Sequence, residues 1–444
     1  DMLSMASDAM KDFLPQLLPL VFIAREDEEK EVLEAFQTVW EEGAGSTSAG
    51  LRIYSDEISN AIRTHLASPS WVVRKMAAKA AFASVDAGEG AGAADAPRSS
   101  RAVSLIPALK VCISNPRMWD GKDCVLKALA SSIVAANAST LPLTNWRTCT
   151  VTSAASTPAA ASDSTMIDAA VCVTAAGTTD ILEADVTLSR SALVQLIVGE
   201  CRKKRSEYRK EALLALTKAL EKLDDVDVAA SVLEVVQEVS AAKKEETPPP
   251  GSVPSAGRDA DEEARYDALM ESKGQQLLRA RALQALAAAW PSSASTRLQL
   301  APAVLQLLEP YFKSPSIDER LAAIAVVSAF CTRMSAQMEE GGGGIAKEWE
   351  GVAPKALLGL YHGMNDLGQT RRAVRKAALT ASEGWFKLGG KMGGALGGCL
   401  DAELRSQLGA VLNELTADQT DIKMKEAAQA LLKELNAFAA TQSA

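Results

Sequence analysis

Apolar residues recur every three or four positions along most of the chain, in consecutive pairs of segments. One stripe runs through residues 51–67 and consists of Leu51, Tyr54, Ile58, Ile62 and Leu66. This spacing predicts a helix with one apolar face. Proline disfavours helical backbone in the residue before it, so we expect this helix to end before Pro69. A second, alanine-rich helix is expected to begin near Trp71.

The same local sequence occurs a second time. A Ser-Pro-Ser sequence starts at Ser68 and again at Ser314, where it precedes an alanine-rich segment that begins at Ile317. In both places a proline turn is followed by the start of a second helix. This recurrence predicts a repeated helix–turn–helix unit. Both prolines are expected in turns.

Similar pairs fill much of the remaining sequence. Their segments are "DFLPQLLPLVFIA" and "EEKEVLEAFQTVWEE", "RAVSLIPALKVCIS" and "KDCVLKALASSIVAA", "ALVQLIVGECRKKR" and "EYRKEALLALTKALEKL", "EWEGVAPKALLGLYHGM" and "RRAVRKAALTASEGWFKL", and "DAELRSQLGAVLNELT" and "DIKMKEAAQALLKEL". One unit cannot bury its apolar face alone and must stack on its neighbours. The pattern therefore predicts an all-α fold, an α-solenoid of about seven or more HEAT-like helix pairs.

Two segments without helical periodicity divide the expected array. Residues 138–180 are rich in Ala, Ser and Thr, and residues 241–260 combine charges with a triple proline. Such compositions offer too little apolar surface to offset the entropy of ordering the chain, so we expect both to be long mobile insertions. HEAT-like repeats are then expected in residues 1–137, 181–240 and 261–444.

An arginine stands near the start of several second helices, followed by small residues. The three instances are Arg74, Arg320 and Arg375. The planar donor fork of arginine suits a bridge to a carboxylate or carbonyl of the next repeat, and we favour this role as a repeat-to-repeat tie. An exposed arginine ladder that binds a partner is the alternative.

Composition narrows the functional classes. The net charge of −9 argues against a nucleic-acid partner, because such binding needs a basic surface that displaces counterions. The seven cysteines are scattered without a Cys-x-x-Cys pair, which favours reduced, buried thiols in a cytosolic or nuclear protein over a disulfide framework. No apolar run has the length of a membrane span, so we expect no membrane insertion.

Residues suited to catalysis or metal binding are few. The two histidines, His65 and His362, each lie near the end of an apolar stripe, without an acid–base partner in the sequence. We favour a polar residue at a helix end for each, and an acid–base group is the alternative. Two histidines and dispersed cysteines form no recognisable zinc spacing. We therefore expect no enzyme activity, no metal or cofactor, and no small-molecule substrate.

The densest basic run is Arg202, Lys203, Lys204 and Arg205. Cations at the C-terminal end of a helix interact favourably with its dipole, so a solvated helix end is the favoured interpretation. A contact with an acidic partner surface, or a nuclear targeting signal, is the alternative. These four residues are the candidate partner contacts.

Three successive segments resemble a known family. They are "PLVFIAREDEEKEVLEAFQTVWEE", "IYSDEISNAIRTHLASPSWVVRKMAAKA" and "NPRMWDGKDCVLKALAS", of which the turn from Trp119 to Asp123 is the most telling. In this order they resemble the C-terminal region of the proteasome adapter and scaffold family of HEAT-repeat proteins. The resemblance is best over residues 14–135 and thins out afterwards. The chain also opens in the middle of a helical pattern, and we expect a fragment of a longer protein.

The resemblance implies a non-enzymatic scaffold that binds the 26S proteasome. Such a scaffold would link the regulatory and core particles in assembly, stability and quality control, in cytoplasm and nucleus, with subunits of both particles as partners. A HEAT-repeat scaffold for cargo or enzyme subunits, of the nuclear-transport or phosphatase type, is the alternative. The long insertions argue against it, because we expect such scaffolds to have short, regular loops.

Overall fold

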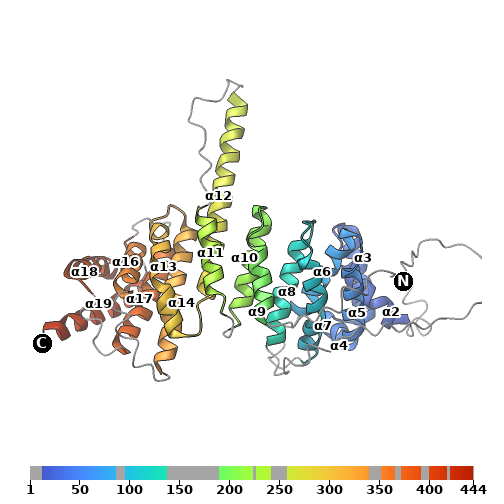
Figure 1. Ribbon diagram of the computed structural model, residues 1–444, viewed down its shortest axis with the longest axis horizontal. Coiled ribbons are helices and arrows are strands. Elements are labelled where there is room, and N and C mark those ends of the chain that lie inside the picture. Colours follow the sequence, from blue (N-terminus) through green and yellow to red (C-terminus); the bar gives the residue numbers. More distant parts are fainter. Residues whose placement is uncertain are drawn as a thin grey trace, which may run out of the picture.

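Helices packed in pairs form one elongated array in the computed structural model, with the chain running from one end to the other (Figure 1). The structure describes residues 13–86, 96–137, 190–223, 227–241, 258–339, 352–365, 372–391, 400–417 and 421–443. Within these ranges the secondary structure is helical, and no strand occurs. The prediction of an all-α solenoid is confirmed.

Eight helix pairs can be followed through the described ranges. They are α2 (Leu14–Ala24) with α3 (Lys30–Ala44), α5 (Ser55–Leu66) with α6 (Trp71–Asp86), α7 (Ala96–Ser114) with α8 (Lys122–Asn137), α9 (Arg190–Glu200) with α10 (Ser206–Leu220), α11 (Ala229–Ala241) with α12 (Arg258–Ala288), α13 (Ala294–Phe312) with α14 (Ile317–Glu339), α16 (Ala353–Met364) with α17 (Arg372–Lys391), and α18 (Ala402–Ala417) with α19 (Ile422–Ser443). The short helix α4 (Thr47–Ile53) precedes α5.

The second helices of the pairs form a continuous row. Helix α6 packs on α8, α8 on α10, α10 on α12, α12 on α14, α14 on α17, and α17 on α19. Small side chains face the neighbours along this row, and Ala77, Ala81, Ala212 and Ala323 are all fully buried. They let the helix axes approach to about the 8–10 Å of ordinary helix packing. The alanines therefore explain why the units stack into one array.

The two Ser-Pro-Ser sequences adopt the same local structure. Helices α6 and α14 begin at Trp71 and Ile317, as predicted, and both prolines lie in turns. The side-chain oxygen of Ser68 accepts a hydrogen bond from the backbone N–H of Ser70 at 3.2 Å. Ser314 repeats the contact with the N–H of the residue two positions on, at 3.1 Å. The first serine closes the turn in each copy.

The prediction of one helix through residues 51–67 is wrong. Helix α4 ends at Ile53 and α5 begins at Ser55, with Tyr54 between them outside the helical conformation, at φ −107° and ψ 32°. Leu51 and Ile58 are nevertheless both buried. The apolar stripe correctly predicted which residues are buried on both sides of the break. Periodicity alone does not show where the backbone leaves the helical conformation.

The two predicted insertions fall largely outside the described residues. Residues 138–180 lie outside them entirely, as do residues 242–257. Helix α12 begins at Arg258, so the last three residues of the 241–260 segment are helical. The pair α11–α12 was not among the predicted units.

Candidate partner-binding surface

The turns that precede the second helices lie together along one edge of the array. We call the part formed by residues 67–72, 115–121 and 201–205 the turn edge. They comprise the connections from α5 to α6, α7 to α8 and α9 to α10, together with the first two residues of α6. Because α6, α8 and α10 pack side by side, their starts are neighbours.

Contacts between the first two turns fix their relative positions. The guanidinium of Arg74 lies 4.6 Å from the ring centroid of Trp119, a cation–π contact. Gly121 has φ +99°, in the left-handed region that favours glycine, and a Cβ there would overlap the side chain of Lys75. The turn from Trp119 to Asp123 therefore requires glycine at this position, because α6 approaches it closely.

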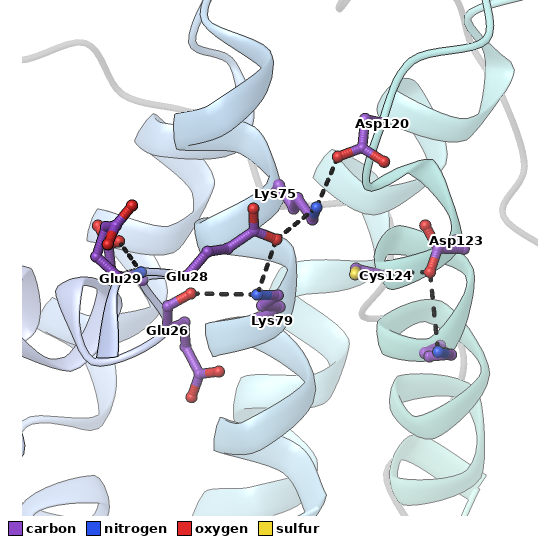
Figure 2. A network of polar contacts seen from close by, with 10 residues as sticks. Glu26, Glu28, Glu29, Lys75, Lys79, Asp120, Asp123 and Cys124 are labelled. Carbon is purple, nitrogen blue, oxygen red and sulfur yellow. Dashed lines mark hydrogen bonds and ion pairs between the residues drawn. The ribbon is translucent and has the colours of Figure 1, made fainter. Parts of the chain in front are cut away.

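Lys75 is the centre of a polar network between three elements (Figure 2). Its ammonium group lies 2.6 Å from Asp120, before α8, and 2.5 Å from Glu28, before α3. The hydrogen bonds to Asp120 and Glu28 raise the pKa of Lys75. The hydrogen bond from Lys75 lowers the pKa of Asp120 and that of Glu28. All three groups are charged at neutral pH, and the network joins three successive units.

A buried ion pair links the second turn to the third. The ammonium group of Lys122 lies 3.1 Å from Glu200 and donates to the backbone carbonyl of Asn115 at 2.8 Å. The hydroxyl of Tyr208 donates to the same carboxylate at 2.7 Å. Burial, followed by this hydrogen bond, raises the pKa of Tyr208. The contact joins α8 to α9 and α10 across residues 138–189.

Apolar and basic side chains are exposed together on the turn edge. Trp71 and Val72 are each 45% exposed and Met118 is 40% exposed. The exposed cations of this edge include Arg117, Lys204 and Arg205. Aromatic residues, methionine and arginine are enriched in protein–protein interfaces, so this combination is typical of a partner-binding surface.

The basic run divides into two halves. Arg202 lies 2.6 Å from Glu234 and 3.3 Å from Glu238, both on α11. Lys203 lies 3.8 Å from Glu200. Lys204 and Arg205 are exposed. The first half contacts the chain's own carboxylates, so Lys204 and Arg205 are the better candidates for a partner.

The three arginines expected to tie repeats together have different surroundings. Arg74 contacts Trp119 of the following unit, and Arg320 donates to the carbonyl of His362 on α16 at 3.2 Å. The Nε atom of Arg375 is buried without a hydrogen-bond partner among the described residues. Whether these arginines stabilise the array stays a prediction.

The other polar candidates lie apart. The Nδ1 atom of His65 is 2.8 Å from the carbonyl of Ala61, within its own helix. His362 lies on α16, and burial lowers its pKa. Cys112, Cys201 and Cys331 are buried free thiols, and burial raises the pKa of Cys331 to about 12. In the described part of the chain, no cluster of three metal-ligating side chains occurs, and no helix is long and apolar enough to cross a bilayer.

Two curated proteins have sequences similar to parts of this chain. Proteasome component ECM29 of Saccharomyces cerevisiae is 29% identical over 114 residues, which cover 26% of this chain and 6% of that protein. Proteasome adapter and scaffold protein ECM29 of Homo sapiens is 28% identical over 137 residues, 30% of this chain and 7% of that protein. The matches therefore span a small fraction of the length of these curated relatives.

A solved structure of yeast importin-beta (Kap95p) aligns with 97% of this chain and 57% of its own, at 13% identity. Its TM-score of 0.25 is too low to support an argument.

A family model described as "ECM29, C-terminal ARM-like repeats" matches residues 183–437, more than half of the chain. The three segments that carry the resemblance all precede residue 183, so the family model rests on other residues. It matches the part where that resemblance thins out. The chain therefore belongs to the ECM29 family, and residues 183–437 are its C-terminal ARM-like repeats.

Proposed function

We propose that this chain is a non-catalytic part of a scaffold that binds the 26S proteasome. The observation that carries the proposal is the family membership of residues 183–437, together with the names of two relatives as proteasome component and proteasome adapter. An elongated array of helix pairs supports it, because such arrays present extended surfaces to partners.

The finer proposal is that the scaffold links regulatory and core particles in assembly, stability and quality control. Length supports this role, because an extended array contacts separate sites on a large assembly. We place the protein in cytoplasm and nucleus, where both particles would be its partners. No observation favours a transport or phosphatase scaffold.

The turn edge is the surface we assign to the contact. Trp71 and Met118 supply apolar area that a partner would cover, and Lys204 and Arg205 supply positive charge. Buried aromatic anchors carry most of the binding energy in many interfaces, while charges at the rim mainly affect association rate and salt dependence. Trp71 should therefore determine affinity, and the two cations should determine the response to salt.

The test is binding of the purified full chain to immobilised, purified 26S proteasomes. Trp71→Ala is expected to weaken binding about tenfold or more, as for an interface anchor. Lys204→Glu with Arg205→Glu should weaken binding and reduce its dependence on salt, because rim charges are screened. Lys423→Glu with Lys433→Glu, exposed cations of α19, is the matched control and should leave binding unchanged.

The outcomes distinguish a wrong assignment of the binding surface from a wrong assignment of the function. Wild-type binding that none of these variants changes would show that the turn edge takes no part. A chain that fails to bind proteasomes in low salt, and whose full-length parent never co-purifies with them, would contradict the scaffold function itself.

A further inference from the structure

The N-terminal part of α12 stands clear of the array (Figure 1). The guanidinium of Arg279 lies 2.6 Å from Glu319, in the first turn of α14. Arg279 on α12 and Glu319 on α14 therefore lie at the same height along the two neighbouring helices. Helix α12 begins at Arg258, about 20 residues earlier, and therefore extends roughly 30 Å past the start of α14 at 1.5 Å per residue. We call residues 258–277 the α12 arm.

The α12 arm carries an exposed apolar stripe. No side chain from Tyr266 to Leu277 is buried, and burial begins at Leu278. Tyr266 is 61% exposed, Leu269 52% and Met270 48%. With Leu277, they occupy positions i, i+3, i+4 and i+11, which lie on one face of a helix. Amphipathic helices that dock in a partner's groove present their anchors with this spacing.

The charge of the α12 arm indicates the chemistry of the groove. From Arg258 to Leu277 the sequence holds six carboxylates and three cations. Asp267 and Glu271 lie beyond the first turn, are exposed, and follow the stripe along one flank. They suit cations at the rim of the partner's groove.

We propose that the α12 arm docks as a helix in an apolar groove with a basic rim on a proteasome subunit. This inference rests on the proposed function and adds a contact separate from the turn edge. A second copy of the chain is the less favourable occupant, because two arms of the same negative charge repel each other. A solvated helix gains nothing from three large apolar side chains on one face, whereas a docked helix buries them.

The test uses the full chain and purified 26S proteasomes. The arm variant combines Tyr266→Ala, Leu269→Ala and Met270→Ala, which removes the anchors and keeps the helix because alanine is the best helix former. The matched control removes three other exposed apolar side chains, 42–51% exposed, with Val111→Ala, Leu214→Ala and Leu358→Ala. We expect the arm variant to weaken binding about tenfold or more, and the control by less than about twofold.

Hydrogen exchange supplies a second readout. Amides from Tyr266 to Leu277 should exchange fast in the free chain and become protected on proteasomes. Asp267→Lys with Glu271→Lys should weaken binding, because these charges would then face a basic rim.

The remaining outcomes each overturn the proposal in a different way. Suppose that the wild type and the arm variant bind proteasomes with the same affinity and that the arm amides stay unprotected on binding. The arm proposal then fails and the proposed function stands. If the wild type does not bind, the arm proposal fails, and the proposed function fails with it if the full-length parent also never co-purifies with proteasomes. A concentration-dependent dimer that the arm variant abolishes would assign the arm to a second copy. Protection of the arm in the free chain would assign it to a segment of the same chain.

Discussion

The ammonium group of Lys122 and the carboxylate of Glu200 form a fully enclosed ion pair, with 0% and 8% of their side chains exposed. Their helices follow one another in space although residues 138–189 separate them in sequence. The pair therefore fixes how the unit before this segment stacks on the unit after it.

We expect Lys122→Met to destabilise this junction by about 3–5 kcal/mol, because the buried carboxylate of Glu200 would lose its nearest cation. Native-state hydrogen exchange of α8 and α10 is the measurement, since an array of repeats need not unfold in one step. Adding Glu200→Gln should recover part of the loss. Lys127→Met, which removes a half-exposed pair with Glu211, is the control and should cost at most about 1 kcal/mol. Equal effects of Lys122→Met and Lys127→Met would contradict the prediction.

The sequence predicted what depends on local chemistry. The starts of α6 and α14 follow from the conformational limits of Pro69 and Pro315, which act on their immediate neighbours. The break between α4 and α5 at Tyr54 could not be predicted, because the apolar residues keep their helical spacing across it. The pair α11–α12 did not follow, because the charged, proline-rich sequence of residues 242–257 separates its two helices.

The candidate surface was predicted only in part. The basic run was found from its composition, but the contacts of Arg202 with Glu234 and Glu238 depend on α11 packing beside it. Trp71 begins an alanine-rich helix whose alanines are buried, yet Trp71 itself is 45% exposed. The sequence shows that a residue is apolar, whereas its exposure depends on where the neighbouring unit ends.

Gly274 lies within the α12 arm, close to the point where the arm leaves the array. A Cβ there would lie 3.4 Å from the ammonium group of Lys210, the far end of a flexible side chain. Gly274→Ala should therefore stabilise the arm by about 0.5–1 kcal/mol, since glycine is unfavourable inside a helix. Slower hydrogen exchange between Tyr266 and Leu277 is the expected result. Gly359→Ala is the contrasting variant and should destabilise the array, because its Cβ would overlap the ring of Phe312. Faster exchange in the Gly274→Ala arm would contradict the prediction.

Arg74 and Trp119 allow a direct test of the repeat-to-repeat tie. We expect Arg74→Met to cost about 0.5–2 kcal/mol at this junction, through the lost cation–π contact. A double-mutant cycle with Trp119→Leu, measured by hydrogen exchange of α6 and α8, isolates the pairwise energy. A coupling energy indistinguishable from zero would show that the two side chains lie close without stabilising each other.

The network around Lys75 predicts how stability depends on pH. The folded-state pKa of Asp120 lies below its ordinary 3.8 and that of Glu28 below its ordinary 4.5, first because each accepts a hydrogen bond from Lys75. A lowered carboxylate pKa stabilises the fold above the unfolded-state pKa, and this stabilisation is lost as pH falls through the folded-state value. Lys75 has a raised pKa, so its contribution is lost as pH rises beyond its ordinary 10.5.

The difference in Tm between wild type and Lys75→Met should therefore be largest between about pH 5 and 9 and shrink in acid and in strong base. Thermal unfolding of both proteins across this range measures it. Lys79→Met is the control, because Lys79 lies 3.6 Å from Glu28 and should produce a smaller difference at neutral pH. A difference between wild type and Lys75→Met that stays constant from neutral pH to pH 3 would mean that the ion pairs contribute nothing, and that Lys75 acts only by packing its aliphatic stem over Gly121.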